Sequence, residues 1–140
     1  MISRLDPAAD SVPDSLLLLR IGVDLIDVAR VERAMNRHGE RFFTRFFTPA
    51  ERDYCQRRPE RLAARIAAKE AVGKAFGTGI GDVRWVEIEV ISDSRGRPAL
   101  RLHGTAAALA DSLGLHHWEI SLSHSDTQAI AFVVAQGRRG

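Results

Sequence analysis

Hydrophobic and polar residues follow the spacing of strands in five segments of the chain. An almost unbroken apolar run from Leu16 to Val28 predicts a buried strand, in which Asp24 points away from the face of Val23 and Leu25. Four later segments alternate apolar and polar residues or are apolar throughout, which also favours strands. They are Trp85–Val90, Ala99–Leu102, Trp118–His124 and Ala129–Ala135. Turn residues join the first two of these segments, and also the last two, which predicts two hairpins.

Apolar residues recur at helical spacing in the segments between them. Helices are predicted from Val28 to about His38, from Pro49 to about Arg57, from Glu60 to Phe76 and from Gly104 to Leu113. Four phenylalanines between positions 42 and 47 are expected in the core. The pattern predicts one α+β domain over residues 16–136, with an antiparallel sheet packed against helices. A loose N-terminal extension (1–15) and a frayed tail (137–140) are expected on either side.

Composition fits an ordinary soluble protein. Of the 140 residues, 45% are hydrophobic and 27% are charged, and the net charge is only +2. The apolar run Leu16–Leu19 is too short to span a bilayer, and the first fifteen residues lack the basic and apolar regions of a secretory signal. The single cysteine, Cys55, excludes an internal disulfide and fits a reducing compartment. We therefore expect a cytoplasmic protein without a membrane partner.

The use of lysine singles out one segment, Arg65–Gly81 (RIAAKEAVGKAFGTGIG). It contains Lys69 and Lys74, the only lysines of the chain, which favours a role that needs a compact ammonium group. Glu70 lies four residues before Lys74 and so shares a face of the predicted helix with it. Three glycines between positions 77 and 81 would let backbone N–H groups approach an anion, although most helix exits of this kind are simple turns. Lys69 receives no role from the sequence.

Arginines line one face of the first predicted helix. Arg30, Arg33 and Arg37 recur at steps of three and four, and only Glu32 lies within the row. Most rows of this kind are simply solvated, but this one would suit an acidic partner, either a protein or a nucleic acid. A non-enzymatic binding module, with bases stacked on the phenylalanines, is therefore an alternative.

Two acidic residues suggest a site for a hard metal ion and a phosphate. Asp24 and Glu70 could share Mg²⁺, which takes one or two carboxylates and completes its shell with phosphate oxygens and water. Lys74 could meet the same phosphates, and Arg65 could reach more distant anionic groups. Such a site serves phosphoryl-group transfer. For Asp24 alone, an aspartate that accepts backbone hydrogen bonds at a strand end is the alternative. Zinc-like ligand spacing and the G-x-S-x-G motif of serine hydrolases are absent.

Five motifs occur in a specific order over Arg20–Val134: GVDLIDVARVE, FTPAE, ARIAAKEAVGKAFGTGIG, SRGRPALRL and SLSHSDTQAIA. In this combination the chain resembles the holo-[acyl-carrier-protein] synthases, the small bacterial type of 4′-phosphopantetheinyl transferase. The resemblance implies the fold of that family, in which a half-size subunit assembles as a homotrimer with an active site at each subunit interface.

The resemblance also implies roles for individual residues. Asp24 and Glu70 match the family's magnesium ligands, and Glu70 and Lys74 are the catalytic candidates. Lys74 matches a lysine that contacts coenzyme A phosphate and is a candidate for protonating the leaving group. The remaining coenzyme A-binding candidates are Arg65, Gly96, Pro98 and His124. Arg30 matches a carrier-docking arginine, and Arg33 and Arg37 extend its row.

The implied reaction moves the phosphopantetheine arm of coenzyme A onto a serine of apo acyl carrier protein, for fatty acid biosynthesis. It depends on Mg²⁺ and releases adenosine 3′,5′-bisphosphate. Glu70, directly or through a metal-bound water, is the candidate base, while a water or a carrier carboxylate stays open as an alternative. The expected partners are coenzyme A, the carrier and two further subunits, without nucleic acid.

Overall fold

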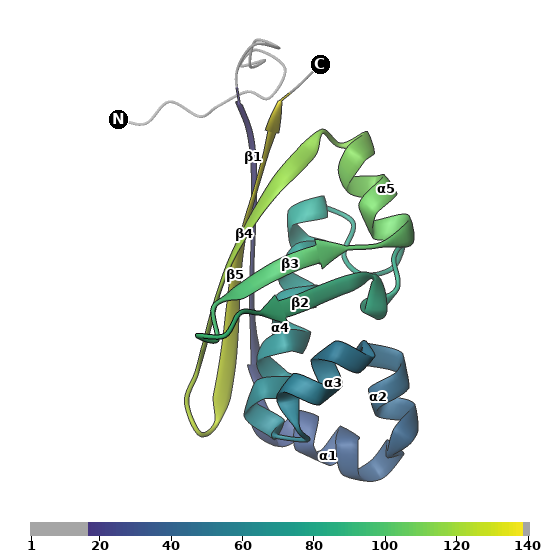
Figure 1. Ribbon diagram of the computed structural model, residues 1–140, viewed down its shortest axis with the longest axis vertical. Coiled ribbons are helices and arrows are strands. Elements are labelled where there is room, and N and C mark those ends of the chain that lie inside the picture. Colours follow the sequence, from purple (N-terminus) through teal and green to yellow (C-terminus); the bar gives the residue numbers. More distant parts are fainter. Residues whose placement is uncertain (1–16, 139–140) are drawn as a thin grey trace, which may run out of the picture.

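The computed structural model describes residues 17–138 of the chain and shows five strands and five helices in that range (Figure 1). In chain order the elements are β1 (Leu17–Asp27), α1 (Val28–His38), α2 (Glu40–Phe46), α3 (Pro49–Cys55), α4 (Pro59–Phe76), a 3₁₀ turn (Trp85–Glu87), β2 (Ile88–Ser92), β3 (Pro98–Leu102), α5 (Gly104–Ser112), β4 (Leu115–His124) and β5 (Gln128–Arg138). The predicted α+β class with antiparallel strands is confirmed. The predicted N-terminal extension lies outside the described residues.

The strands form two antiparallel units that both pack against the long helix α4. Strands β1, β5 and β4 lie side by side in that order, and β2 pairs with β3 as a separate hairpin. Helix α4 packs on β1 and β5, the short helices α1–α3 gather at one end, and α5 lies at the other (Figure 1). One buried cluster lies between α4, the sheets and α5, and a second fills the α1–α3 end, where Phe42, Phe43 and Phe47 are buried as predicted.

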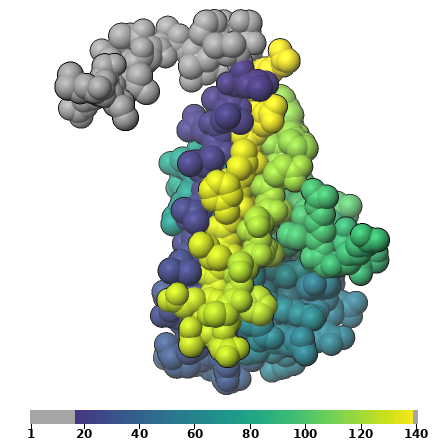
Figure 2. Space-filling model, turned by 90° about the vertical axis from the view of Figure 1, so that its left-hand side faces the viewer, coloured from purple at the N-terminus to yellow at the C-terminus, as the bar shows by residue number. Residues whose placement is uncertain are grey.

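The outer face of the three-stranded sheet is not covered by any described element (Figure 2). The prediction of a buried strand over residues 16–28 is therefore wrong for one face of β1. Alternate β1 side chains, together with two from β5, are between 40% and 64% exposed. They are Leu17, Leu19, Ile21, Val23, Leu25, Ile130 and Phe132. The sequence suggested burial because an apolar run does not reveal whether a covering element exists on both sides of a strand.

The inner face of β1 lies unusually close to α4. A Cβ atom added at Gly22 would stand 1.8 Å from the Ala71 carbonyl oxygen, so only glycine fits at this crossing. Alanines dominate the facing side of α4, with Ala67, Ala68 and Ala71 each fully buried. This close approach places the residues that follow Gly22 directly beside the middle of α4.

Most helix and strand boundaries agree with the sequence, and three differ. Helix α2 was not predicted, because its seven residues are too few to show a period. Trp85–Glu87 is a 3₁₀ turn, and the polar residues of the predicted strand, Glu87 and Glu89, are buried acceptors of hydrogen bonds. Strand β5 pairs with β1 as far as Arg138, so Gly137 and Arg138 are not the frayed tail that was expected.

Candidate functional site

The predicted site residues Asp24, Glu70 and Lys74 come together where β1 crosses α4. Lys74 Nζ donates hydrogen bonds to the Val23 carbonyl oxygen at 2.9 Å and to Asp24 Oδ1 at 3.2 Å. The Asp24 side chain is 19% exposed and that of Lys74 is 54% exposed, so the pair lies at the surface edge of the crossing. Because Lys74 is the more exposed partner, its ammonium group can also turn toward a ligand.

A pocket of about 420 Å³ opens beside the two carboxylates. Its polar side carries Asp24, Glu70 and Arg30, and its remaining walls are apolar. The apolar walls come from Leu25, Ile26, Val31, Ala34, Phe42, Phe46, Ile66 and Trp85. The Trp85 ring packs edge-on against Phe46 with 4.8 Å between centroids. The pocket therefore combines a charged edge with a hydrophobic interior.

The pKa of Glu70 depends both on its burial beside the pocket and on its charged neighbours. Partial burial and the Asp24 carboxylate raise the pKa of Glu70, while the cations Lys74 and Arg30 act in the opposite direction. The two carboxylates thus repel each other and would gain from a further cation between them. Oxygen donors of this kind fit Mg²⁺, which accepts one or two carboxylates and keeps water or phosphate oxygens in its remaining positions. Among residues 17–138 no group of three His, Cys, Asp or Glu side chains could hold a metal by itself.

Arg65 lies on the same helix as Glu70 but points to another side. Its side chain is almost completely buried, donates to Ser92 Oγ at 2.8 Å and stacks on the Tyr54 ring at 4.3 Å. Its Nε atom has no hydrogen-bond partner among the described residues. Gly96 lies next to the same Tyr54, at φ +82°, in the turn that leads to Pro98 on β3. Arg65 and Gly96 therefore both lie beside the Tyr54 side chain.

His124 is exposed at the end of β4, with β5 between it and the strand that carries Asp24. Within one chain the structure does not bring His124 to the carboxylates. On α1, Arg30 borders the pocket, while Arg33 and Arg37 are exposed further along and do not line it. The sequence missed the pocket walls Phe46 and Trp85, because it expected the phenylalanines in the core or, as an alternative, stacked on bases, and Trp85 in a strand.

A membrane-spanning helix is not found among the described residues, since none of their helices is both long and apolar enough. The comparison with protein families matches residues 20–133 to the 4′-phosphopantetheinyl transferase superfamily. The holo-[acyl-carrier-protein] synthase of Herpetosiphon aurantiacus is 50% identical to the chain, over 86% of this chain and 100% of that protein. That of Alkalilimnicola ehrlichii is 45% identical, over 86% of this chain and 98% of that protein.

Solved structures of the same kind share the fold. The apo-ACPS of Chronobacterium ammoniagenes has a TM-score of 0.78 at 36% identity, and the alignment covers 89% of this chain and 100% of that one. The Helicobacter pylori holo-[acyl-carrier-protein] synthase in complex with coenzyme A has a TM-score of 0.76 at 30% identity, and the alignment covers 82% of this chain and 98% of that one.

Proposed function

Because the chain belongs to the 4′-phosphopantetheinyl transferase superfamily, and within it to the holo-[acyl-carrier-protein] synthases, we propose that it transfers 4′-phosphopantetheine from coenzyme A to a serine of apo acyl carrier protein. Membership in this family makes it an enzyme. The released product is adenosine 3′,5′-bisphosphate. The cellular context proposed is fatty acid biosynthesis in the cytoplasm, in keeping with a free, buried Cys55.

One observation carries the proposal: Asp24, Glu70 and Arg30 form the charged edge of an otherwise apolar pocket, and Lys74 donates a hydrogen bond to one of the two carboxylates. Pyrophosphate needs neutralising charge, and the pantetheine arm or a carrier side chain needs an apolar surface. Arg30 and a cation held by Asp24 and Glu70 would supply the positive charge, and the remaining walls of the same cavity supply the apolar surface. A site that bound anions without further specificity would need only cationic side chains and no carboxylates.

Asp24 and Glu70 are the residues that would hold Mg²⁺, which when bound supplies positive charge opposite the pyrophosphate oxygens. Lys74, which donates a hydrogen bond to Asp24, is the proposed contact to a phosphate oxygen and the proposed proton donor to the departing phosphate. The buried Arg65, whose Nε is unpartnered among the described residues, is the candidate for a more distant anionic group of coenzyme A. Gly96 lies in the turn beside the same Tyr54, and Pro98 begins β3 after that turn.

Glu70 is the proposed acceptor of the proton from the carrier serine. Burial and the Asp24 charge raise the pKa of Glu70, which makes its carboxylate a better base than an ordinary glutamate. Attack by the serine oxygen on the β-phosphorus of coenzyme A then forms the new phosphodiester bond and breaks the pyrophosphate link. The proton balance closes if Lys74 protonates the leaving phosphate and Glu70 keeps the serine proton.

The carrier is proposed to dock on α1, with Arg30 next to the carboxylates and Arg33 and Arg37 further out. Arg30 is the member of the row that connects the docking surface to the pocket. Acidic groups of the carrier would pair with these exposed arginines, so the association should weaken as salt increases. Membership in an enzyme family argues against the non-enzymatic binding module.

The chain is proposed to work as a homotrimer. The uncovered apolar row on β1 and β5 is the surface expected to be buried between subunits, since several large apolar side chains exposed together on one sheet face are typical of a protein–protein contact. In one chain His124 stands apart from Asp24 and Glu70, so its proposed contact with coenzyme A would be made to the site of a neighbouring subunit.

The test is the mass of an apo acyl carrier protein after incubation with coenzyme A, Mg²⁺ and the enzyme. We expect the carrier to gain one phosphopantetheine group, with turnover strongly reduced in Glu70→Gln, Asp24→Asn and Lys74→Met. Asp111→Asn is the matched control, because Asp111 is an exposed carboxylate on α5, outside the pocket and away from the arginines of α1. No mass gain with any carrier, or full activity of Glu70→Gln, would refute the proposal.

A further inference from the structure

Lys69, the lysine without a role in the proposed reaction, is the most completely buried charged side chain of the described region. Its side chain is 0% exposed, as is that of its partner Glu51. Its ammonium group donates to Glu51 Oε1 at 2.8 Å, to the Trp85 carbonyl oxygen at 3.0 Å and to the Ile88 carbonyl oxygen at 2.6 Å. All three N–H donors of the ammonium group are therefore used.

Stability alone is a weak explanation for this arrangement. Burying an ion pair costs desolvation free energy, and well-packed apolar residues at such positions are often as stable or more stable. Burial acts to lower the pKa of Lys69, and the charge of Glu51 opposes that shift. What an apolar residue cannot supply is the pair of bonds to the Trp85 and Ile88 carbonyl oxygens. These two carbonyls lie at either end of the 3₁₀ turn Trp85–Glu87.

The 3₁₀ turn that Lys69 holds contributes one wall of the pocket. The Trp85 ring lines the pocket on which Glu70 also borders, and it packs on Phe46. Glu70 is the next residue after Lys69 on α4. One turn of one helix therefore presents a carboxylate to the pocket and, on another side, an ammonium group that holds the Trp85 backbone.

Glu51 is itself held in place, which makes the ammonium contact rigid. Its Oε1 accepts from the Thr48 backbone N–H at 3.0 Å, completing the capping box of α3, and its Oε2 accepts from the Val90 N–H at 2.9 Å. Lys69 thus joins α4, α3 and the start of β2 through a single atom. A planar guanidinium group needs more acceptors in a wider space, so arginine would not replace it.

We propose that Lys69 is a positioning residue for the transfer reaction: it holds Trp85 at a fixed distance from Glu70 and so sets the width of the pocket beside the carboxylates. The inference rests on the proposed function for its kinetic consequence. The link between Lys69 and Trp85 can also be measured without any turnover.

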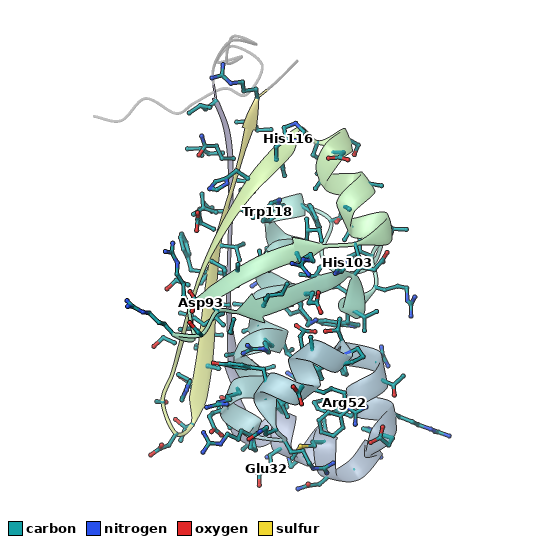
Figure 3. The ribbon with its side chains drawn as sticks, in the orientation of Figure 1. Glu32, Arg52, Asp93, His103, His116 and Trp118 are labelled. Carbon is teal, nitrogen blue, oxygen red and sulfur yellow. The ribbon has the colours of Figure 1, made fainter. Side chains whose placement is uncertain are left out.

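The test follows Trp85 by fluorescence in a Trp118→Phe background, in which it is the only tryptophan. Trp118 lies on β4 (Figure 3), where its ring packs on Phe76, and it takes no part in the Lys69 hydrogen bonds. Glu51→Gln keeps the ammonium group and its two carbonyl contacts, whereas the double variant Glu51→Gln/Lys69→Met removes both charges together. Each protein is measured well below its own Tm for emission, acrylamide quenching and kcat/KM.

We expect Glu51→Gln to retain the quenching of the background protein, and the double variant to show stronger quenching of Trp85. Its kcat/KM should fall at least about tenfold, because misplacing a substrate-contacting wall by about 1 Å can cost a hundredfold. A folded double variant whose quenching and kcat/KM both match those of Glu51→Gln would overturn the proposal.

Trp85→Ala provides a second test if the Lys69 variants do not fold. It leaves the Lys69–Glu51 pair intact and should lower kcat/KM to a similar extent; an unchanged kcat/KM would also overturn the proposal. If the wild-type enzyme modifies no carrier, the proposed function fails instead. The quenching comparison then still decides whether Lys69 positions Trp85.

Discussion

The substitution Gly22→Ala tests whether the close crossing of β1 and α4 builds the site. An ideal Cβ at this position would lie 1.8 Å from the Ala71 carbonyl oxygen and 2.8 Å from the Ala71 carbonyl carbon. Ordinary contacts between heavy atoms begin at about 3.5 Å, so the two backbones must separate by about 1.5–2 Å. Both clashing atoms belong to the backbone, and therefore Ala71→Gly cannot relieve the contact.

This displacement would act directly on the two carboxylates. Gly22 and Asp24 are two residues apart on one face of β1, and Ala71 follows Glu70 on α4. Metal–ligand distances tolerate only about 0.2 Å, so a shift of more than 1 Å would prevent Asp24 and Glu70 from sharing the proposed Mg²⁺ ion. We expect kcat/KM to fall about a hundredfold and the Mg²⁺ concentration for half-maximal rate to increase. Overpacking should cost about 1–3 kcal/mol of unfolding free energy, which leaves the protein folded.

The assay combines initial rates of carrier modification over a range of Mg²⁺ concentrations with thermal unfolding by circular dichroism. Gly81→Ala is the stability control, because a Cβ at Gly81 meets no atom within 4 Å and its backbone is not left-handed. Its Tm should match that of the wild type. A Gly22→Ala enzyme with wild-type kcat/KM and unchanged Mg²⁺ dependence would refute the claim that this crossing positions the carboxylates.

Further predictions concern stability, reactivity, association and docking. Burial alone would raise the pKa of Glu87, but hydrogen bonds from Thr105 and from the Arg84 backbone N–H lower it. Ionised Glu87 therefore stabilises the fold above about pH 4.3 and loses this effect as the pH falls. Glu87→Gln should flatten the acid side of a curve of Tm against pH. Burial raises the pKa of Cys55 to about 11, so a thiol reagent at pH 8 should label the native enzyme only at the rate of unfolding. Ile21→Glu, on the exposed apolar row, should reduce the molar mass measured by light scattering to that of one chain. Arg30→Ala should raise KM for the carrier several-fold with kcat little changed at physiological salt; equal KM values would exclude Arg30 from docking.

Residues that act through local spacing could be predicted from the sequence. The capping box Thr48–Glu51, the C-terminal glycine of α4 and the helical face shared by Glu70 and Lys74 each depend on neighbours within four residues. Asp24 on the face opposite Val23 follows from the two-residue period of a strand. Its meeting with Glu70 does not follow from spacing: the sequence suggested it from the oxygen ligands that Mg²⁺ prefers, and the family resemblance implied the same pair.

Features that depend on long-range contacts were missed. Lys69 binds groups 16–19 residues further on and 18 residues back, so no local pattern identifies its acceptors. Glu87 and Glu89 looked like the solvent side of an alternating strand. In the structure Thr105 donates to Glu87, and Thr48 and His103 form hydrogen bonds with Glu89 from other elements. Polar residues in an alternating pattern reveal which face they occupy but not whether another element covers that face.

The two faces of β1 link the proposed active site to the proposed subunit contact. Gly22, Asp24 and Ile26 turn inward, whereas Ile21, Val23 and Leu25 form the exposed apolar row. Because successive side chains point to opposite faces, a one-residue slip against β5 would move Asp24 to the outer surface and an apolar side chain toward Glu70. The register, in which Asp24 stands opposite Ala131 and Leu25 opposite Ile130, therefore fixes both surfaces at once. A polar substitution on the outer row can weaken association without moving Asp24, whereas a single-residue deletion before Asp24 would be expected to abolish both.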